Sequence, residues 1–301
     1  MYYGIITMNI KLPVGMVTFG NLKYTKITYE SLLESTSLDL DVVIVVGKPN
    51  DKDTIEWAVD NDVPMIIHDK NMGFPASVND IYDYFWSGDS TLPLIIIGND
   101  VIVYPEAADN LYYHHMVHGS DWVSASELYT PKEFISVFPD SRDLFDRRYG
   151  LLEFKKDADY RKIVDTYTGS QGNRVTNLVD EDKIGDSHNL CLFSRKLFDT
   201  LGYIDVNFFP AYFEDNDYGK RAQLSESLKM VRLDYSHYFH FWSRTIYEEN
   251  MRVTNDRVFP MNKQYYISKW GGEPGKETKT GEISIFTREH EEITIDYWRN
   301  K

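Results

Sequence analysis

The first hundred residues alternate between short apolar runs and more polar stretches. Four of the apolar runs have the length of β-strands and lie at residues 15–19, 42–46, 64–67 and 94–97. The second run is β-branched throughout, which is typical of a strand buried on both faces of a sheet. Turn residues such as Gly20-Asn21 close the runs. The pattern therefore predicts four strands in the first third of the chain.

The stretches between these strands are more polar and carry helix signals. A polar stretch around residues 25–37 separates the first two strands. Pro75 stands where a helix can begin. In the two later connections, apolar residues recur at helical spacing: Ile55, Ala58 and Val59, then Val78, Ile81, Tyr82 and Phe85. Strands that alternate with helices predict an α/β fold whose parallel sheet has right-handed crossovers.

In a parallel α/β sheet, ligands bind beyond the carboxyl ends of the strands. This rule singles out four loops, at residues 19–21, 47–51, 69–74 and 98–101. The last three loops carry a carboxylate or an amide. The first loop lacks the G-x-G-x-x-G pattern, which disfavours a dinucleotide-binding dehydrogenase.

The regular pattern weakens in the middle of the chain. Residues 128–186 are irregular and rich in polar clusters, as in an insertion that lines an acceptor site or in a plain surface excursion. Regular signals return at residues 190–201. From about residue 236 the chain reads as an extension, with a break at Trp270-Gly271-Gly272-Glu273-Pro274-Gly275 and an alternating, strand-like Ile293-Thr294-Ile295 near its end.

Composition narrows the class of protein. The 47 acidic and 32 basic residues give a formal net charge of −15, which disfavours general nucleic-acid binding. No apolar run approaches the ~20 residues that span a bilayer, and the N-terminus does not read as a signal peptide. We therefore expect a cytoplasmic protein. The single Cys191 lies in an apolar run and is predicted to be buried.

The strongest candidate for chemistry is the acidic cluster Glu214-Asp215-Asn216-Asp217. Three carboxylates in four residues repel one another, which raises at least one pKa or requires a cation or an arginine nearby. Arg221 follows Asp217 by four residues, a spacing that brings the two together on a helix. Acids also accumulate at the start of helices for purely electrostatic reasons, so composition alone leaves a solvated helix cap as the alternative.

The residues around this cluster resemble those of a known family. Two consecutive runs are similar to the "GxFDExFFxxxEDxDxxxR" segment of family 2 glycosyltransferases, especially the rhamnosyltransferase-like branch. They are Leu201-Gly202-Tyr203-Ile204-Asp205-Val206-Asn207-Phe208-Phe209 and Tyr212-Phe213-Glu214-Asp215-Asn216-Asp217-Tyr218-Gly219-Lys220-Arg221. Three weaker resemblances follow the family's order: Asn71-Met72-Gly73-Phe74 with Ala76 and Asn79, then Ile97-Gly98-Asn99-Asp100-Val101, and last His240-Phe241-Trp242-Ser243. The resemblance covers about residues 14–245, with a gap across the irregular middle of the chain.

The resemblance implies a GT-A fold, with a mainly parallel mixed sheet flanked by helices. It implies a catalytic domain at residues 1–235, divided into a nucleotide-sugar half at about 14–105 and an acceptor half at about 106–235. Residues 236–301 would form a C-terminal extension. Lys269-Trp270-Gly271 within it resembles a closing element of the family, which could act as a lid, an acceptor contact or a structural anchor.

The resemblance also implies roles for the acidic cluster. Asp215 would be the general base that takes the proton of an acceptor hydroxyl, in a single displacement that inverts the anomeric carbon. Glu214 and Asp217 would orient the acceptor and support the loop, with Arg221 as a partner.

On the donor side, Asp100 would approach the diphosphate through Mn²⁺ or Mg²⁺. His240 would be a second metal ligand or a diphosphate contact. Donor-binding residues would be Thr18, Asp51, Asn71, Asn79, Asn99, Asp100 and Arg221. The family's usual Asp-x-Asp motif is incomplete here because Gly98 precedes Asn99-Asp100. A metal would therefore need the diphosphate and another side chain to complete its shell.

The predicted function is transfer of a sugar from a nucleoside-diphosphate sugar, with uridine diphosphate as the default nucleotide, to a hydroxyl of a saccharide or similar acceptor. A protein side chain or a modified DNA base is a less favoured acceptor. Two alternatives stay open. A sugar nucleotidyltransferase would need a glycine-rich basic loop that Gly20-Asn21-Leu22-Lys23-Tyr24 does not supply. A catalytically silent sugar- or nucleotide-binding module would bind a nucleotide sugar without releasing the sugar.

Overall fold

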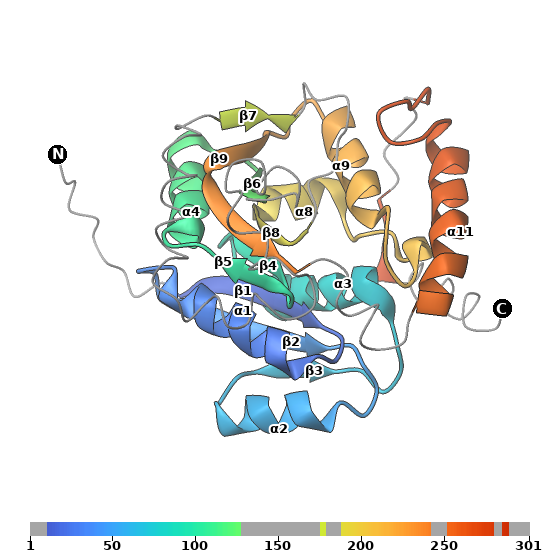
Figure 1. Ribbon diagram of the computed structural model, residues 1–301. Helices are drawn as coiled ribbons and strands as arrows, with labels where there is room; N and C mark the ends of the chain where they lie inside the picture. Colours follow the sequence, from blue (N-terminus) through green and yellow to red (C-terminus); the bar gives the residue numbers. More distant parts are fainter. Residues whose placement is uncertain (1–10, 128–174, 179–187, 242–251, 280–284, 289–301) are drawn as a thin grey trace, which may run out of the picture.

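The computed structural model describes residues 11–127, 175–178, 188–241, 252–279 and 285–288. These residues form a twisted central sheet with helices on both of its faces (Figure 1). The strand order is β3-β2-β1-β4-β8-β6-β9-β5, and β7 pairs with β9 beside this path. The irregular segment at 128–186 lies almost wholly outside the described residues, as do Trp242, Ser243 and the strand-like segment at 293–295.

The first part of the sheet is parallel and follows the sequence prediction. Its strands are β1 (Leu12–Thr18), β2 (Leu40–Val46), β3 (Met65–Ile67) and β4 (Leu94–Gly98). The connecting helices are α1 (Leu22–Glu34), α2 (Lys52–Asp60) and α3 (Gly73–Trp86). The polar stretch between the first two strands therefore forms a helix. Its buried positions are mostly small or hydroxyl-bearing side chains, so apolar residues mark its inner face only weakly.

The second part of the sheet is mixed. After β5 (Val101–Val103) and helix α4 (Ala107–His118) come β6 (Trp122–Glu127), β7 (Val175–Asn177) and β8 (Leu190–Phe193). Strand β8 runs antiparallel to both β4 and β6. Helix α8 (Arg195–Leu201), the 3-10 helix η3 (Val206–Phe208), helix α9 (Glu214–Leu224) and strand β9 (Met230–His240) follow. Strand β9 continues across residue 236, where the sequence placed a domain boundary.

Two hydrophobic clusters hold helices against opposite faces of the sheet. Alternate residues of β2 show the division, because Ile44 belongs to one cluster and Val43 to the other. One cluster holds residues of α1, α2 and α4, and the other holds residues of α3, α8 and α9. Cys191 is buried in the second cluster, as predicted. The result is a three-layer α/β fold.

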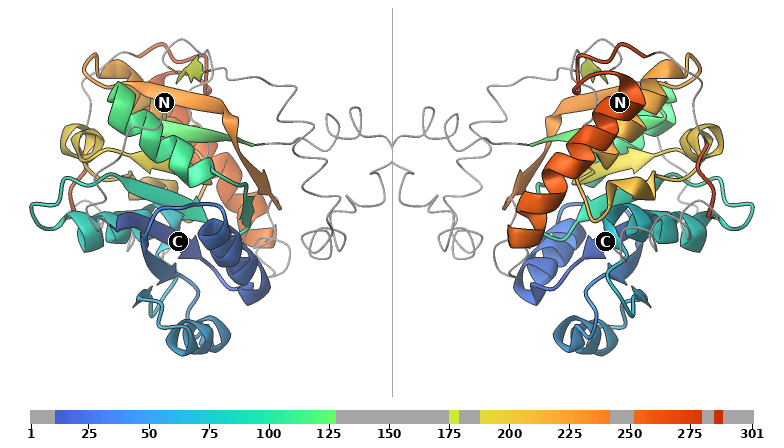
Figure 2. Two further views of the ribbon diagram at one scale, coloured as in Figure 1. Left: turned by 90° about the vertical axis from the view of Figure 1, so that its left-hand side faces the viewer. Right: turned by 90° about the vertical axis from the view of Figure 1, so that its right-hand side faces the viewer.

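Helix α11 (Arg252–Trp270) packs along the outer side of α9 (Figures 1 and 2). Phe213, Tyr266 and Trp270 form a small aromatic cluster between the two helices. The C-terminal part of the chain is therefore in contact with the helix that begins at the acidic cluster. Among the described residues, no helix is both long enough and apolar enough to cross a membrane.

Candidate functional site

A cavity of about 470 Å³ opens beyond the carboxyl ends of β1 and β4. This is the position at which α/β sheets bind their ligands. Residues from eight parts of the chain line the cavity, including α11: Val17, Thr18, Phe19, Gly47, Asn71, Gly73, Phe74, Gly98, Asn99, Asp100, His188, Asn189, Pro210, Ala211, Tyr212, Phe213, Glu214, Asp215, Asn216, His240 and Phe259.

Asp100 and His240 meet at one wall of the cavity because of the register of the sheet. Val101, the first residue of β5, pairs with His240 at the end of β9. The Asp100 carboxylate consequently lies 3.3 Å from Nε2 of His240, and the Asn189 amide lies 3.2 Å from its Nδ1. Burial alone would lower the pKa of His240, but the charges of Asp100 and Glu127 outweigh it and raise that pKa above its usual value.

Asn99 organises the end of β1 next to this pair. Its amide donates hydrogen bonds to the hydroxyl oxygens of Thr18 and Thr25, each at 3.1 Å, and to the carbonyl of Gly20 at 3.3 Å. Thr18 and Asn99 both line the cavity, but the Thr18 hydroxyl and the Asn99 amide nitrogen contact one another, Gly20 and Thr25. Their contribution to the site is therefore to fix the shape of this wall.

Glu214 and Asp215 reach the cavity from the first turn of α9. Burial raises the pKa of Glu214 well above its usual range, and the neighbouring Asp215 raises it further. One carboxyl oxygen of Glu214 is buried without a hydrogen-bond partner among the described residues. Asp215 is more exposed, and its Oδ1 accepts a 2.7 Å hydrogen bond from the backbone of Asn216. The two neighbouring acids therefore differ in environment, because Glu214 is buried, which favours its protonated form, and Asp215 is more exposed.

The loop before α9 has a backbone conformation that two other helices hold in place. Tyr212 and Phe213 have φ values of 80° and 71°, a backbone region that residues other than glycine rarely adopt. The buried amide of Asn262, on α11, donates to the carbonyl of Ala211 at 2.8 Å. On the other side, the backbone N–H of Phe74 in α3 donates to the carbonyl of Pro210 at 2.7 Å.

Gly73 is required for this close approach between α3 and the loop. Its φ is +83°, and a Cβ atom there would lie 2.9 Å from the Phe209 ring and 3.0 Å from the Pro210 carbonyl oxygen. Asn71 caps the same turn, since its side-chain oxygen accepts from the Gly73 N–H at 2.9 Å. The Asn71-Met72-Gly73-Phe74 segment thus shapes the wall of the cavity opposite the start of α9.

Asp217 and Arg221 point away from the cavity. Both side chains are fully buried, and the Arg221 Nε lies 3.1 Å from an Asp217 oxygen. The other Arg221 nitrogens donate to the carbonyls of Leu201 and Tyr203 at 2.8 and 2.9 Å. The predicted ion pair is present, but it serves the packing of α9 and leaves neither residue on the cavity wall.

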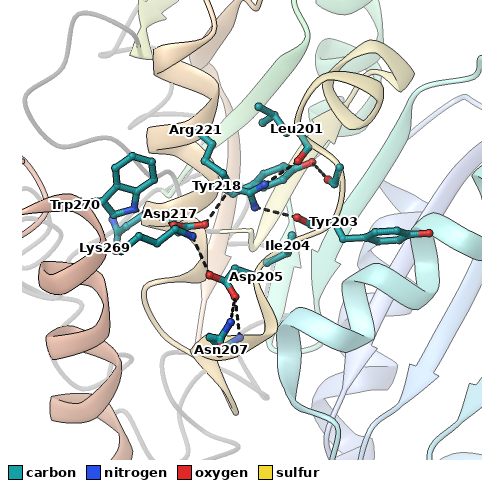
Figure 3. Close-up of polar contacts among 12 residues, drawn as sticks. Leu201, Tyr203, Ile204, Asp205, Asn207, Asp217, Tyr218, Arg221, Lys269 and Trp270 are labelled. Atoms are coloured by element: carbon teal, nitrogen blue, oxygen red, sulfur yellow. Dashed lines mark hydrogen bonds and ion pairs between the residues drawn. The ribbon is translucent and has the colours of Figure 1, made fainter. Parts of the chain in front are cut away.

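The C-terminal helix completes the same buried cluster (Figure 3). Lys269 forms ion pairs with Asp217 at 2.6 Å and with Asp205 at 2.8 Å, and the Trp270 indole donates to Asp217 at 2.8 Å. Burial raises the pKa of Asp205, but Lys269 and Asn207 outweigh this effect and hold the pKa below its ordinary value. Of the roles open to Lys269-Trp270-Gly271, these contacts favour the structural anchor.

Two further predicted donor-binding residues also lie off the cavity wall. Asn79 is fully buried in α3 and uses its amide on both sides, donating to the Ile204 carbonyl at 2.9 Å and accepting from the Ile204 N–H at 2.8 Å. Asp51 caps helix α2, accepting from the Thr54 N–H at 3.3 Å. Neither side chain is among those that line the cavity.

Sequence reasoning missed several residues that line the cavity, among them His188, Asn189 and Phe259. His188 and Asn189 stand directly before β8, and Phe259 comes from α11. The polar run Asp186-Ser187-His188-Asn189 ahead of an apolar strand was the signal available for the first two. Phe259 had no comparable signal, because its place depends on how α11 packs against the loop before α9.

Similar proteins were found only among solved structures. No family model matches the sequence, and no curated protein matches it. A crystal structure of GalNAc-T7 with UDP, GalNAc and Mn²⁺ is similar over 76% of this chain and 43% of that one, at 10% identity and a TM-score of 0.50. A crystal structure of S. aureus TarS 1-349 is similar over 79% of this chain and 63% of that one, at 14% identity and a TM-score of 0.48.

The chain thus spans less than two thirds of the length of either structure. At these identities the likeness shows the fold alone, and it confirms the predicted GT-A type, a mixed α/β sheet flanked by helices. The rhamnosyltransferase-like branch of family 2 stays a prediction.

Proposed function

We propose that the protein is a glycosyltransferase that moves a sugar from a nucleoside-diphosphate sugar to an acceptor hydroxyl, with inversion. The observation that carries the proposal is the arrangement of two groups around one cavity. The carboxylates at the start of α9 line it on one side, and the Asp100–His240 pair lines it on another. A base and a diphosphate-binding pair around one space are what sugar transfer from a nucleotide requires.

Asp215 acts as the general base in this proposal. The acceptor hydroxyl gives its proton to the Asp215 carboxylate while its oxygen bonds to the anomeric carbon. The bond between that carbon and the diphosphate oxygen breaks on the opposite face, and the nucleoside diphosphate leaves with the electron pair. Attack and departure on opposite faces invert the anomeric configuration.

The neighbouring Glu214 supports the charge of Asp215. Burial raises the pKa of Glu214 well above its usual range, which favours the neutral carboxyl and lessens the negative charge beside the base. A protonated carboxyl is also a hydrogen-bond donor, and one of its oxygens has no partner among the described residues. It suits a hydroxyl of the acceptor, in agreement with the orienting role that the sequence assigned to Glu214.

At the Asp100–His240 side of the cavity, the protein supplies some but not all of the ligands that a divalent cation needs. The described residues contain no cluster of three or more His, Cys, Asp or Glu side chains that could hold a metal ion alone. Asp100 and His240 offer an oxygen and a nitrogen ligand 3.3 Å apart, and the diphosphate oxygens would complete the shell. Bound there, Mn²⁺ or Mg²⁺ would offset the negative charge of the leaving diphosphate.

A first prediction concerns this metal. With UDP as the nucleotide, Mn²⁺ should raise the melting temperature of the wild type beyond the increase given by UDP alone. Asp100→Asn should weaken the Mn²⁺ response by about 10-fold or more in the concentration required, because a ligand is lost. Asp109→Asn, on α4 and outside the cavity, is the control. An unchanged Mn²⁺ response in Asp100→Asn would remove Asp100 from the metal site.

A second prediction tests the reaction itself and separates it from the alternatives. The purified protein, given UDP-sugars one at a time, should release free sugar and UDP slowly, since water can replace the missing acceptor. Proton NMR of the released sugar should show the inverted anomer before mutarotation. A silent binding module would bind without release, and a nucleotidyltransferase would form a nucleotide sugar from a nucleoside triphosphate and a sugar phosphate. Either result would overturn the proposal.

A further inference from the structure

His188 is a buried polar side chain in the cavity wall for which the function proposed above gives no role. It is 3% exposed, and neither ring nitrogen has a hydrogen-bond partner among the described residues. Both nitrogens of a histidine ring normally find partners when buried, because an unpaired polar group loses its hydrogen bonds to water without replacement. His188 differs from other buried histidines in lining the cavity, where a bound ligand can supply the missing partner.

The surroundings of His188 are aromatic. Its ring lies 5.4 Å from that of Trp122, 5.5 Å from Phe193 and 6.1 Å from Tyr218, and it stacks on Phe74 at 6.3 Å. Burial among these rings lowers the pKa of His188 to about 3, so the imidazole is neutral at physiological pH. A neutral imidazole has one N–H donor and one acceptor nitrogen. Either nitrogen can therefore hydrogen-bond to a hydroxyl group, which is itself both a donor and an acceptor.

His188 lies between the Asp100–His240 pair and the helix α9 that carries Glu214 and Asp215. The next residue, Asn189, places its amide 3.2 Å from His240, which is paired with Asp100. On its other side, the His188 ring contacts Tyr218, which is one turn of α9 after Glu214. The residue thus connects the diphosphate end to the helix that carries the catalytic carboxylates.

We infer that His188 binds a hydroxyl group of the donor's sugar ring and is a specificity-determining residue of the site. The inference rests on the proposed function. In a nucleotide sugar, the ring that is transferred lies between the diphosphate and the attacking acceptor, which is where His188 is placed. A sugar without a hydroxyl at the matching position would leave that ring nitrogen unpaired, and such sites discriminate strongly between substrates.

The test compares variants by their binding of UDP and of UDP-sugars, measured by calorimetry and thermal shift. His188→Phe keeps an aromatic ring of similar size in an aromatic pocket and removes both polar atoms. We expect it to bind UDP as the wild type does, and to bind the UDP-sugar used by the wild type roughly 10- to 100-fold more weakly. Without ligand, its melting temperature should rise by roughly 2–4 °C, because unpaired buried atoms are gone.

Two further variants sharpen the comparison. His188→Gln keeps one donor and one acceptor, so its affinity for the UDP-sugar should lie between those of the wild type and His188→Phe, and it carries the test if the latter does not fold. His237→Phe is the matched control: His237 is 2% exposed, burial lowers its pKa to about 4, and it lies outside the cavity wall. It should leave the affinities for UDP and the UDP-sugar unchanged.

Each contrary result has its own meaning. If both His188 variants bind the UDP-sugar as tightly as the wild type does, the inference is wrong and the proposed function stands. If they lose UDP and UDP-sugar binding equally, His188 only supports the fold of the site, and the inference is again wrong. If the wild type binds no nucleoside diphosphate or nucleotide sugar, testing the guanosine, cytidine and thymidine forms included, the proposed function and the inference fail together.

Discussion

Asp215→Asn should lower the turnover number of sugar transfer by about 10²–10⁴-fold, the usual contribution of a general base. Asparagine has nearly the same shape as aspartate and can still accept from the Asn216 N–H, which contacts Oδ1 at 2.7 Å. It cannot take the acceptor's proton. The affinity for UDP and for the UDP-sugar should stay close to that of the wild type, because the diphosphate end of the cavity is formed by Asp100 and His240.

The measurement is steady-state transfer or slow donor hydrolysis, with donor affinity determined separately by calorimetry. Asp199→Asn is a suitable control, since Asp199 is a surface residue of α8 whose side chain is 55% exposed. Turnover in Asp215→Asn equal to that of the wild type would show that Asp215 is not the base. A fall in donor affinity as large as the fall in turnover would assign Asp215 to donor binding.

The second large effect concerns stability. Lys269→Met should lower the free energy of unfolding by about 3–5 kcal/mol at neutral pH, because it removes the cation from two buried carboxylates. Asp205 and Asp217 are both fully buried, and Lys269 lies 2.8 Å and 2.6 Å from them (Figure 3). Methionine fills a similar volume, so the loss reflects charge more than packing. Urea unfolding followed by circular dichroism measures it.

This loss should depend on pH in a defined direction. In the wild type the pKa of Asp205 is held below its ordinary value, so its contribution is complete above the ordinary aspartate pKa of about 3.9 and disappears below it. Without Lys269, burial raises that pKa, and the carboxyl can take a proton as the pH falls. The difference between variant and wild type should therefore be largest near pH 7 and shrink toward pH 4.

A second lysine of the same helix provides the control. Lys263 pairs with Glu273 at 2.7 Å, but both side chains are 40% or more exposed. Lys263→Met should leave the free energy of unfolding nearly unchanged, because exposed ion pairs contribute little. Equal destabilisation by both substitutions, or a Lys269→Met effect that does not vary with pH, would argue against the buried charge cluster as the cause.

The sequence predicted the framework of the site well where the signals were local. The β-branched run at 42–46 and the helical spacing from Val78 to Phe85 depend only on neighbours in the chain, and both elements are present as β2 and α3. The strand ends meet at one edge of the sheet, and Thr18, Asn99 and Asp100, which the family resemblance had singled out, line the cavity there. The acidic cluster was equally visible, and Glu214 and Asp215 do line the cavity.

The direction in which a side chain points was harder to predict than the helix or strand to which its residue belongs. Asp215 and Asp217 are two residues apart on a helix and so face different sides of it. Only the fold shows that the side chain of Asp217 turns inward, because its partners Lys269 and Trp270 come from more than fifty residues later in the chain. Asn79 likewise matches a motif, but its side-chain amide is hydrogen-bonded to the backbone of Ile204, which lies 125 positions later in the chain.

By itself, then, the sequence predicted the alternating strands and helices of the first hundred residues and singled out the acidic cluster, because periodicity and residue order are properties of the chain alone. The GT-A type of fold was predicted from the resemblance of its motifs to those of a known family. The tertiary structure decided which of the polar residues face the cavity. It set the pairing of Asp100 with His240 through the register of β5 and β9, and it placed His188 in the cavity wall with no partner for its ring among the described residues. Burial and partnering depend on which distant segments pack together, and no local pattern records that.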